Sequence, residues 1–249
     1  MRRRLQHLTS GLGLCSGYRW VVKDSRTVVV SLLSLFCAIL LVLHHLRRRL
    51  RRVDRIYLRL MGPLLRPHEV RGGLPGAFWF LVGAACAVAL FPRDVALQSI
   101  LHLSVGDPIA SVVGVKLGDQ SRVLPGGKSL AGFFAAFVAC WMSTLLIFGC
   151  CCHPPNRDDT FPHGDRNSND WSSISAILGA FGSACTAIGG SENRGRRLLW
   201  LWYGLLGGVS GAVGECVPLG VDDNLSMPIV SGLVFLGLSE ITFGGPRQM

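Results

Sequence analysis

The sequence predicts an all-α, polytopic helical membrane protein with about seven transmembrane helices, and three observations support this. Hydrophobic types make up 49% of the 249 residues and charged types only 16%, whereas soluble domains usually carry roughly a quarter. The mean hydropathy is positive, at +0.41. The few charges are unevenly spread, so that long windows approach the roughly 20 apolar residues that cross a bilayer. A soluble core would show shorter apolar runs at the period of a helix or a strand.

The expected spans follow one another along a single membrane-embedded domain that covers residues 1–249. The first, at 8–22, is weak because glycines interrupt it. The second, at 27–46, contains no Lys, Arg, Asp or Glu and is the clearest of the set. The remaining spans are expected at 74–91, about 95–115, 130–150, 198–216 and 227–238 with its flanks.

A basic segment at 47–66 carries most of the excess behind the net charge of +10. An apolar stripe recurs in it at helical spacing, formed by Leu50, Val53, Tyr57, Leu60 and Leu64. An amphipathic helix of this kind lies in the membrane surface, where anionic phospholipid headgroups attract it. An ordinary cytosolic loop that follows the positive-inside rule is a compatible alternative. Nucleic-acid binding is not expected, because no platform of aromatic side chains accompanies the arginines.

Basic residues also set the expected orientation. They gather at residues 2–4, at 47–59 and in the loop 116–129, which the positive-inside rule places in the cytosol. Two expected spans separate each of these segments from the next, so the three agree. A loop or insert of uncertain structure follows at 151–197. Within it, 172–190 is only mildly apolar and reads as an extra span, a re-entrant piece or a poorly ordered insert.

Asp107 stands inside the fourth expected span and is a candidate functional residue. A carboxylate within a span is costly unless it has a partner, so it predicts a functional site. The nearby Gly106, Ala110, Ser111 and Gly114 are small, which lets backbone and ligand approach closely. We therefore expect Asp107 to hold a metal ion or to act as a base. The alternative is a helix-end residue paired with an arginine.

A phosphate site is predicted where the polar loop meets the fifth span. Gly126 and Gly127 precede Lys128 and Ser129 at the expected start of that helix. An ammonium, a hydroxyl and the backbone N–H groups of a helix N-terminus suit a phosphate group. The loop is not a Walker A motif, because position 122, where that motif requires glycine, is arginine.

A second acidic group lies near the last two spans. Glu215 ends the sixth expected span, and Asp222, Asp223 and Asn224 follow in a short turn. Carboxylate and amide oxygens are ligands for Mg²⁺, which phosphoryl transfer usually requires. We therefore expect this turn to join Asp107 around Mg²⁺ or another divalent cation. A helix-capping turn is the alternative.

The site also decides the expected topology. If 172–190 crossed the membrane, the Asp-Asp-Asn turn would lie opposite Lys128. A site for one Mg²⁺–nucleotide cannot be divided across about 30 Å of hydrocarbon. We therefore expect 172–190 to be interfacial, re-entrant or disordered, with seven spans and a lumenal C-terminus. This choice places Arg194, Arg196 and Arg197 on the side that the positive-inside rule disfavours.

Several ordered motifs resemble the polyprenol kinase family, which includes CTP-dependent diacylglycerol kinases, phytol kinases and dolichol kinases. Three of them are LSVGDPIASVVGVKLG, GGKSLAGFFAAF and VDDNLSMPIVSG. The N-terminal RRRLQH is similar to the family's Arg-Lys-x-x-His, with Arg4 in place of the lysine. The middle of the fungal CTP-dependent diacylglycerol kinases resembles VDRIYLRLMGPLLRPHEVRGGLPGAFWFLVG. The likeness covers nearly the whole chain apart from about 150–197.

The resemblance implies a lipid kinase that transfers the γ-phosphate of a nucleoside triphosphate, usually CTP, to a lipid hydroxyl. With diacylglycerol as the substrate, the product is phosphatidate. By position, Arg3, Arg4, Asp107 and Gly114 match family residues tied to activity, and His7 matches the histidine of the N-terminal motif. The change from lysine to arginine at Arg4 keeps the charge and alters the geometry. The resemblance also implies an integral protein of the endoplasmic reticulum or nuclear envelope, with its active site facing the cytosol.

Three alternatives stay open. A phosphatidate cytidylyltransferase uses the same nucleotide but attacks its α-phosphate, and its signature continues Pro-Gly-His-Gly-Gly into an Asp-Arg-x-Asp run. Here LPGG leads into KSLAG, which favours the kinase. A kinase for dolichol or phytol would share the motifs, and they do not fix CTP over ATP. A membrane transporter is the non-enzyme alternative, but no matching pair of interrupted helices in the two halves supports it.

Overall fold

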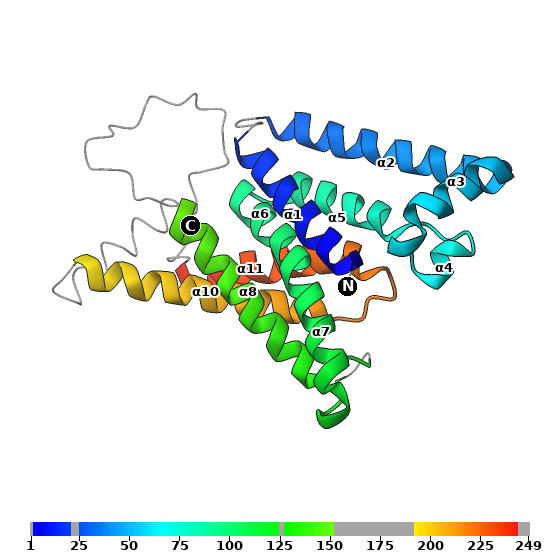
Figure 1. Cartoon of the computed structure of the whole chain (residues 1–249). Coiled ribbons are helices and arrows are strands. Elements are labelled where there is room, and N and C mark those ends of the chain that lie inside the picture. Colours follow the sequence, from blue (N-terminus) through cyan, green and yellow to red (C-terminus); the bar gives the residue numbers. More distant parts are fainter. Residues whose placement is uncertain (1, 21–24, 125–126, 152–191, 244–249) are drawn as a thin grey trace.

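The computed structural model describes residues 2–20, 25–124, 127–151 and 192–243, and most of these residues are helical (Figure 1). Within this part of the chain, a single bridge between Val123 and Ser129 is the only β pairing. The all-α prediction is confirmed for these residues. Three described helices are long and apolar enough to cross a membrane, Arg26–Arg49, Arg93–Gln120 and Asp223–Thr242, and two shorter apolar ones are Gly76–Leu90 and Leu130–Leu146. Such helices fit an integral membrane protein.

The first two helices differ in how they meet the rest of the molecule. α1 (Arg2–Trp20) starts earlier than the expected span, and near its end the Cys15 thiol lies 3.8 Å from the Leu97 carbonyl oxygen. α2 (Arg26–Arg49) buries few residues and packs against α5 (Gly76–Leu90). Large apolar side chains stay exposed along it, among them Leu35, Phe36, Ile39 and Val42. An exposed apolar surface of this extent is typical of a helix that faces lipid.

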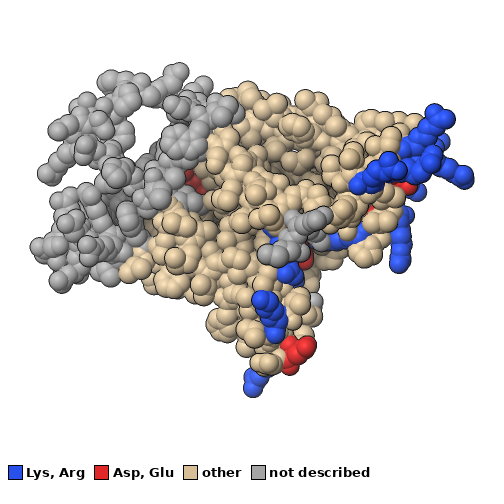
Figure 2. Space-filling model, viewed as in Figure 1, with Lys and Arg blue, Asp and Glu red and all other residues tan. Residues whose placement is uncertain are grey.

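The predicted interfacial helix at 47–66 is wrong in its extent, because the chain breaks within it. The segments that replace it are the last turn of α2, an extended Leu50, α3 (Arg51–Met61), η1 (Gly62–Leu64) and α4 (Pro67–Val70). Buried Arg47 holds the bend, since its Nε donates to Asp54 Oδ1 at 2.9 Å and its guanidinium lies 4.5 Å from the Tyr57 ring centroid. The arginines of α3 stay exposed, and this end of the molecule carries the basic group at the right of Figure 2.

A long interrupted helix follows α5. It consists of α6 (Arg93–Leu101), the π-helical turn η2 (His102–Gly106) and α7 (Asp107–Leu117). π-helical turns are rare and occur frequently at functional sites, and this one ends directly before Asp107. The main hydrophobic core lies where this helix meets α1, α2, α5, α10 and α11, and it includes Val88, Val95, Ile100 and Phe235.

α8 (Leu130–Cys151) and α10 (Glu192–Cys216) pack closely through glycines. A Cβ added at Gly211 would overlap Cys140 Sγ, and one at Gly207, earlier in α10, would overlap Thr144, which comes later in α8. Small residues allow this close approach between membrane helices. The two helices are therefore antiparallel, and the end of α10 meets the start of α8. α10 begins at Glu192 rather than at 198, while 152–191, with the expected segment 172–190, lies outside the described residues.

One end of the helical bundle collects the basic segments, and we name it the basic end. It holds the N-terminus of α1, the bend between α2 and α3, the loop before α8 and the turn before α11 (Asp223–Phe243) (Figure 1). Hydrogen bonds and ion pairs join these segments, as in Arg4 with Ser111, Arg66 with Asp222 and Lys128 with Glu215. On the face in Figure 2, lysines and arginines gather at this end. The expectation that the three basic segments share one side agrees with these contacts.

Candidate active site

Lys128 is fixed before α8 by a tight loop that follows η3 (Gly118–Gln120). The Leu124 N–H donates to the Lys128 carbonyl oxygen at 2.7 Å, which closes the loop across its base. Gly127 has a φ of +80°, a left-handed conformation that glycine adopts without strain. Gly126 lies outside the described residues. The glycine-rich loop thus holds Lys128 at the basic end with its side chain 29% exposed.

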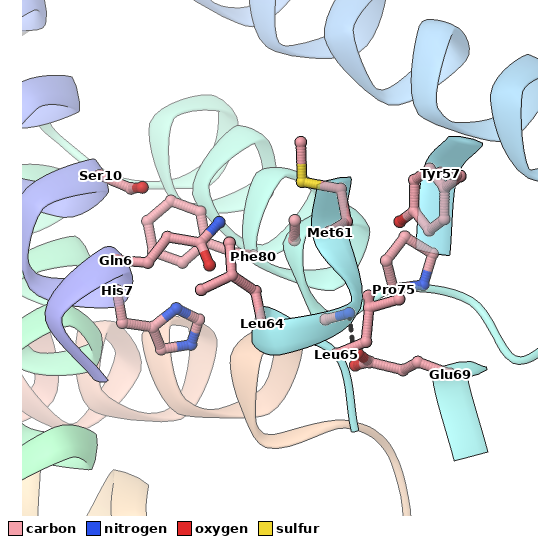
Figure 3. Close-up of a pocket in the computed structure, with 12 residues that line it drawn as sticks. Gln6, His7, Ser10, Tyr57, Met61, Leu64, Leu65, Glu69, Pro75 and Phe80 are labelled. Carbon is pink, nitrogen blue, oxygen red and sulfur yellow. Dashed lines mark hydrogen bonds between the residues drawn. The ribbon is translucent and has the colours of Figure 1, made fainter. Parts of the chain in front are cut away.

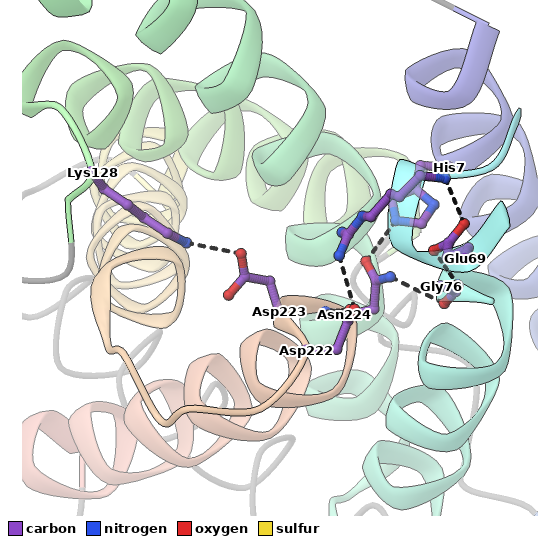
Figure 4. A network of polar contacts seen from close by, with 8 residues as sticks. His7, Glu69, Gly76, Lys128, Asp222, Asp223 and Asn224 are labelled. Carbon is purple, nitrogen blue, oxygen red and sulfur yellow. Dashed lines mark hydrogen bonds and ion pairs between the residues drawn. The ribbon is translucent and has the colours of Figure 1, made fainter. Parts of the chain in front are cut away.

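The Lys128 ammonium lies between the acidic side chains of Glu215 and Asp223, and Figure 4 shows its pair with Asp223. Its Nζ donates to Glu215 Oε1 at 3.0 Å, to the Glu215 carbonyl oxygen, and to Asp223 Oδ2 at 3.4 Å. Burial lowers the pKa of Lys128, but the charges of Glu215 and Asp223 and their hydrogen bonds outweigh burial and raise it above its usual value. Lys128 is therefore protonated at neutral pH.

The sequence analysis singled out Glu215 but did not place it among the predicted ligands or catalytic residues. It is 8% exposed, and its second oxygen, Oε2, is buried without a hydrogen-bond partner in the part of the chain that the structure describes. The charges of Asp107 and Asp223 both act on it. An ionisable residue at the end of an apolar run is the same signal that singled out Asp107, so Glu215 could have been added to the predicted site.

The three carboxylates and the lysine form a group that we name the carboxylate cluster: Asp107, Glu215, Asp223 and Lys128. Asp107 is the first residue of α7 and is half-buried. Glu215 and Asp223 pair with the Lys128 ammonium, and the charge of Asp107 acts on Glu215, so the group carries a net negative charge that is partly removed from water. Such a site favours an added cation.

The small residues around Asp107 serve helix packing. A Cβ at Gly106 would lie 2.8 Å from Cys140 Sγ, and one at Gly114 would lie 3.1 Å from Ser129 Oγ. Ser129 Oγ also accepts from the Gly132 N–H at 3.1 Å, which caps the start of α8. Of the predicted nucleotide-binding residues, Gly114 and Ser129 thus bring α7 against the start of α8 next to Lys128, and Gly106, in η2, approaches α8 at Cys140.

The Asp222–Asn224 turn does not present its side chains to one point. Asp222 Oδ2 pairs with Arg66 at 2.9 Å, whereas Asp223 turns to Lys128. Asn224 is buried and donates to the Gly76 carbonyl oxygen at 3.0 Å. No three His, Cys, Asp or Glu side chains in the described residues form a metal-binding group. The predicted ligand set of this turn with Asp107 is therefore not assembled, because neighbouring residues at a helix start point in different directions.

α1 brings two of its predicted residues to the site. The Arg4 guanidinium donates to Ser111 Oγ at 2.9 Å, one turn beyond Asp107 on α7. His7 is 9% exposed, and its Nε2 lies 2.7 Å from Asn224 Oδ1. The side chain of Arg3 lies outside the described part of the chain.

Three curated fungal proteins named CTP-dependent diacylglycerol kinase 1 match this sequence. The Schizosaccharomyces pombe protein is 29% identical over 72% of this chain and 66% of its own length, and the Saccharomyces cerevisiae protein is 28% identical over 72% and 53%. The Eremothecium gossypii protein is 36% identical over 51% of this chain and 39% of its own.

The chain is similar to the fungal CTP-dependent diacylglycerol kinases over much of its length. The resemblance inferred from the motifs is confirmed at this level. The chain spans between about two fifths and two thirds of the length of these relatives. No protein-family model and no solved structure matches it.

Proposed function

We propose that the protein transfers the γ-phosphate of CTP to the hydroxyl of diacylglycerol, forming phosphatidate and CDP. The observation that carries this proposal is the carboxylate cluster, which joins residues of three separate family-like motifs at one end of the apolar helices. The names of the fungal relatives supply the nucleotide and the lipid. Because the chain spans only part of those relatives, the activity has to be tested on this chain itself.

Asp107 is assigned to the lipid hydroxyl and Lys128 to the phosphates. Transfer of the hydroxyl proton to the Asp107 carboxylate frees the oxygen to attack the γ-phosphorus, the bond to the bridging oxygen breaks, and CDP leaves. Lys128 is charged and partly exposed, and it pairs with Glu215, on which the charge of Asp107 acts, so it suits the phosphates. Arg4 adds a second cation beside α7. Gly126 and the side chain of Arg3, which the structure does not describe, keep their predicted roles in this proposal.

The donor chemistry of the cluster fits a divalent cation, which we propose is Mg²⁺. Asp107, Glu215 and Asp223 would have to draw closer together to hold it, since they do not form a metal-binding group as they stand in the described residues. Glu215 Oε2, buried and unpaired among the described residues, is the oxygen best suited to take part. When bound, the cation would neutralise charge on the phosphates. Asn224, which sequence reasoning placed among the ligands, instead fixes the turn.

We further propose that the chain crosses the membrane seven times, as one domain, with the basic end in the cytosol. In support, α1, α2, α5, α6–α7, α8, α10 and α11 run alternately away from and toward the basic end. The positive-inside rule places that end in the cytosol. The arginines of α3 would then contact anionic phospholipid headgroups. The family resemblance supports the endoplasmic reticulum or nuclear envelope as the membrane.

The test uses purified full-length protein in lipid–detergent micelles, with CTP labelled at the γ- or the α-phosphate. Label from the γ-position in phosphatidate supports the kinase, whereas α-label entering lipid would make the protein a cytidylyltransferase. Parallel reactions with dolichol, phytol and ATP identify the alcohol and the donor. Asp107→Asn should remove the activity, and the matched control Asp119→Asn, an exposed carboxylate on η3, should keep it. Absence of label transfer to any alcohol would reject the proposed function.

A further inference from the structure

A pocket opens at the basic end between α1, α3 with η1, and the start of α5 (Figure 3). Its apolar wall includes Met61, Leu64 and Phe80, and α1 contributes Gln6 and Ser10 on the other side. Its volume is about 80 Å³. A cavity of about 150 Å³ holds benzene. The pocket has about half that volume, so it can admit only part of the glycerol and ester region and not acyl chains.

We infer that this pocket binds the glycerol and ester region of diacylglycerol, an inference that rests on the proposed function. Among the residues that line it in the described chain there is no lysine or arginine, so the pocket lacks the cations that phosphates require. Glu69 is buried there, but its two oxygens accept the Arg66 and Gly76 N–H groups at 2.8 Å each. What remains for a ligand is neutral and mixed: an amide at Gln6, a hydroxyl at Ser10 and apolar side chains.

The position of the pocket suits a substrate that stays in the bilayer. Tyr57 and Met61 line it from α3, and on the same helix Ile56 and Leu60 are 60% and 67% exposed beside exposed arginines. A helix with this pattern lies at the membrane surface. Acyl chains can remain among the lipids there while the glycerol end enters the pocket.

The pocket is also joined to the carboxylate cluster. His7 lines it and bonds to Asn224 through Nε2, with its ring 5.4 Å from that of Phe80. Asn224 directly follows Asp223, which pairs with Lys128 on the far side of the turn (Figure 4). A glycerol group in the pocket would therefore lie next to the turn that separates it from the phosphate-transferring groups.

The direct test is photo-crosslinking without nucleotide. A diacylglycerol carrying a diazirine close to one ester is incorporated into vesicles with the full-length protein, and labelled peptides are mapped by mass spectrometry. We expect labelling of α1, η1 and the start of α5, and competition by unlabelled diacylglycerol. Labelling confined to other helices would overturn the inference. Because no nucleotide is present, this result does not depend on whether the proposed phosphate transfer occurs.

Kinetics provide the second test. Ser10→Phe should fill the pocket and raise the KM for diacylglycerol about tenfold or more, with the KM for CTP changed less than about twofold. The matched control is Thr9→Phe, an exposed neighbour on α1 that does not line the pocket. Gln6→Leu, which keeps the size and removes the amide, should act in the same direction if Ser10→Phe fails to fold. A rise in the KM for CTP alone would assign the pocket to the cytosine base. Unchanged KM values for both substrates in both variants would reject any substrate role for the pocket.

Discussion

The substitution Glu215→Gln tests whether the Glu215 carboxylate is needed for activity or only for the fold. Its effect on stability should be small. Glutamine keeps the size of the side chain and an oxygen that accepts from Lys128 Nζ, which lies 3.0 Å from Oε1. The lost ion pair contributes only about 1 kcal/mol, because the Lys128 side chain is 29% exposed and Asp223 remains as a partner. Repulsion from Asp107 and the desolvation of a buried charge also disappear, and both changes favour the variant. We expect the free energy of unfolding to change by no more than about 1 kcal/mol.

The same substitution should lower activity far more. A unit charge about 4 Å from a charged group contributes about 4 kcal/mol at an effective dielectric constant near 20, and Asp107 and Asp223 remain to supply part of this. We therefore expect a loss of about 2 to 3 kcal/mol of transition-state stabilisation, which is roughly 30- to 150-fold in kcat/KM.

The assay measures kcat/KM for CTP over a range of Mg²⁺ concentrations, beside thermal unfolding of the same purified protein. Glu240→Gln is the matched control, because Glu240 is an exposed carboxylate near the other end of α11. The variant at position 215 should also require more Mg²⁺. If it keeps more than half of the activity, or if activity and stability fall together, Glu215 only supports Lys128 and the proposed cluster is wrong.

Four further outcomes follow from the same contacts. Asp107→Ala should abolish lipid phosphorylation while the protein still accumulates in membranes; near-normal label transfer by the purified variant would reject its role. Lys128→Ala should raise the KM for CTP about tenfold or more and the KM for diacylglycerol far less, and a change confined to the lipid KM would contradict this. Gly211→Ala should lower the free energy of unfolding by about 1 to 3 kcal/mol, since its Cβ would overlap Cys140 Sγ. In thermal unfolding, the double variant with Cys140→Ala should regain part of that lost stability, rather than show the sum of the two single losses. Asp223→Cys, at a side chain that is 46% exposed, should react with an impermeant thiol reagent from the cytosolic side of sealed vesicles in a background without other reactive cysteines; labelling from the lumen alone would reverse the orientation.

Hydropathy and charge were sufficient to predict the helices and to single out Asp107 and Lys128 of the carboxylate cluster, for a physical reason. A chain in lipid must form the hydrogen bonds of its backbone N–H and C=O groups within each segment, so long apolar runs predict helices. An ionisable side chain in such a run is costly, which is why the sequence alone singles out Asp107. Lys128 could be found because a glycine loop before a helix is a local feature of the sequence.

The directions of side chains could not be predicted, because they depend on tertiary neighbours. Asp222, Asp223 and Asn224 are adjacent, yet successive side chains at a helix start diverge by about 100°. They meet Arg66, Lys128 and His7 respectively. Likewise, the break at Leu50 follows from a buried contact of Arg47 with Asp54 that the periodicity of 47–66 does not reveal.

The ion pairs of Lys128 also carry topological information. Lys128 precedes α8, Glu215 ends α10 and Asp223 begins α11, so its two acidic partners come from different helices. The contacts exist only if the start of α8 and the turn between α10 and α11 share one side of the membrane, since opposite sides would lie about 30 Å apart. The same pairs that neutralise Lys128 thus tie the motif around residue 128 to the motif around residue 223. The proposed site and the proposed topology both require Lys128 and Asp223 to lie on the same side of the membrane. The labelling of position 223 and the kinetics of position 128 must therefore agree.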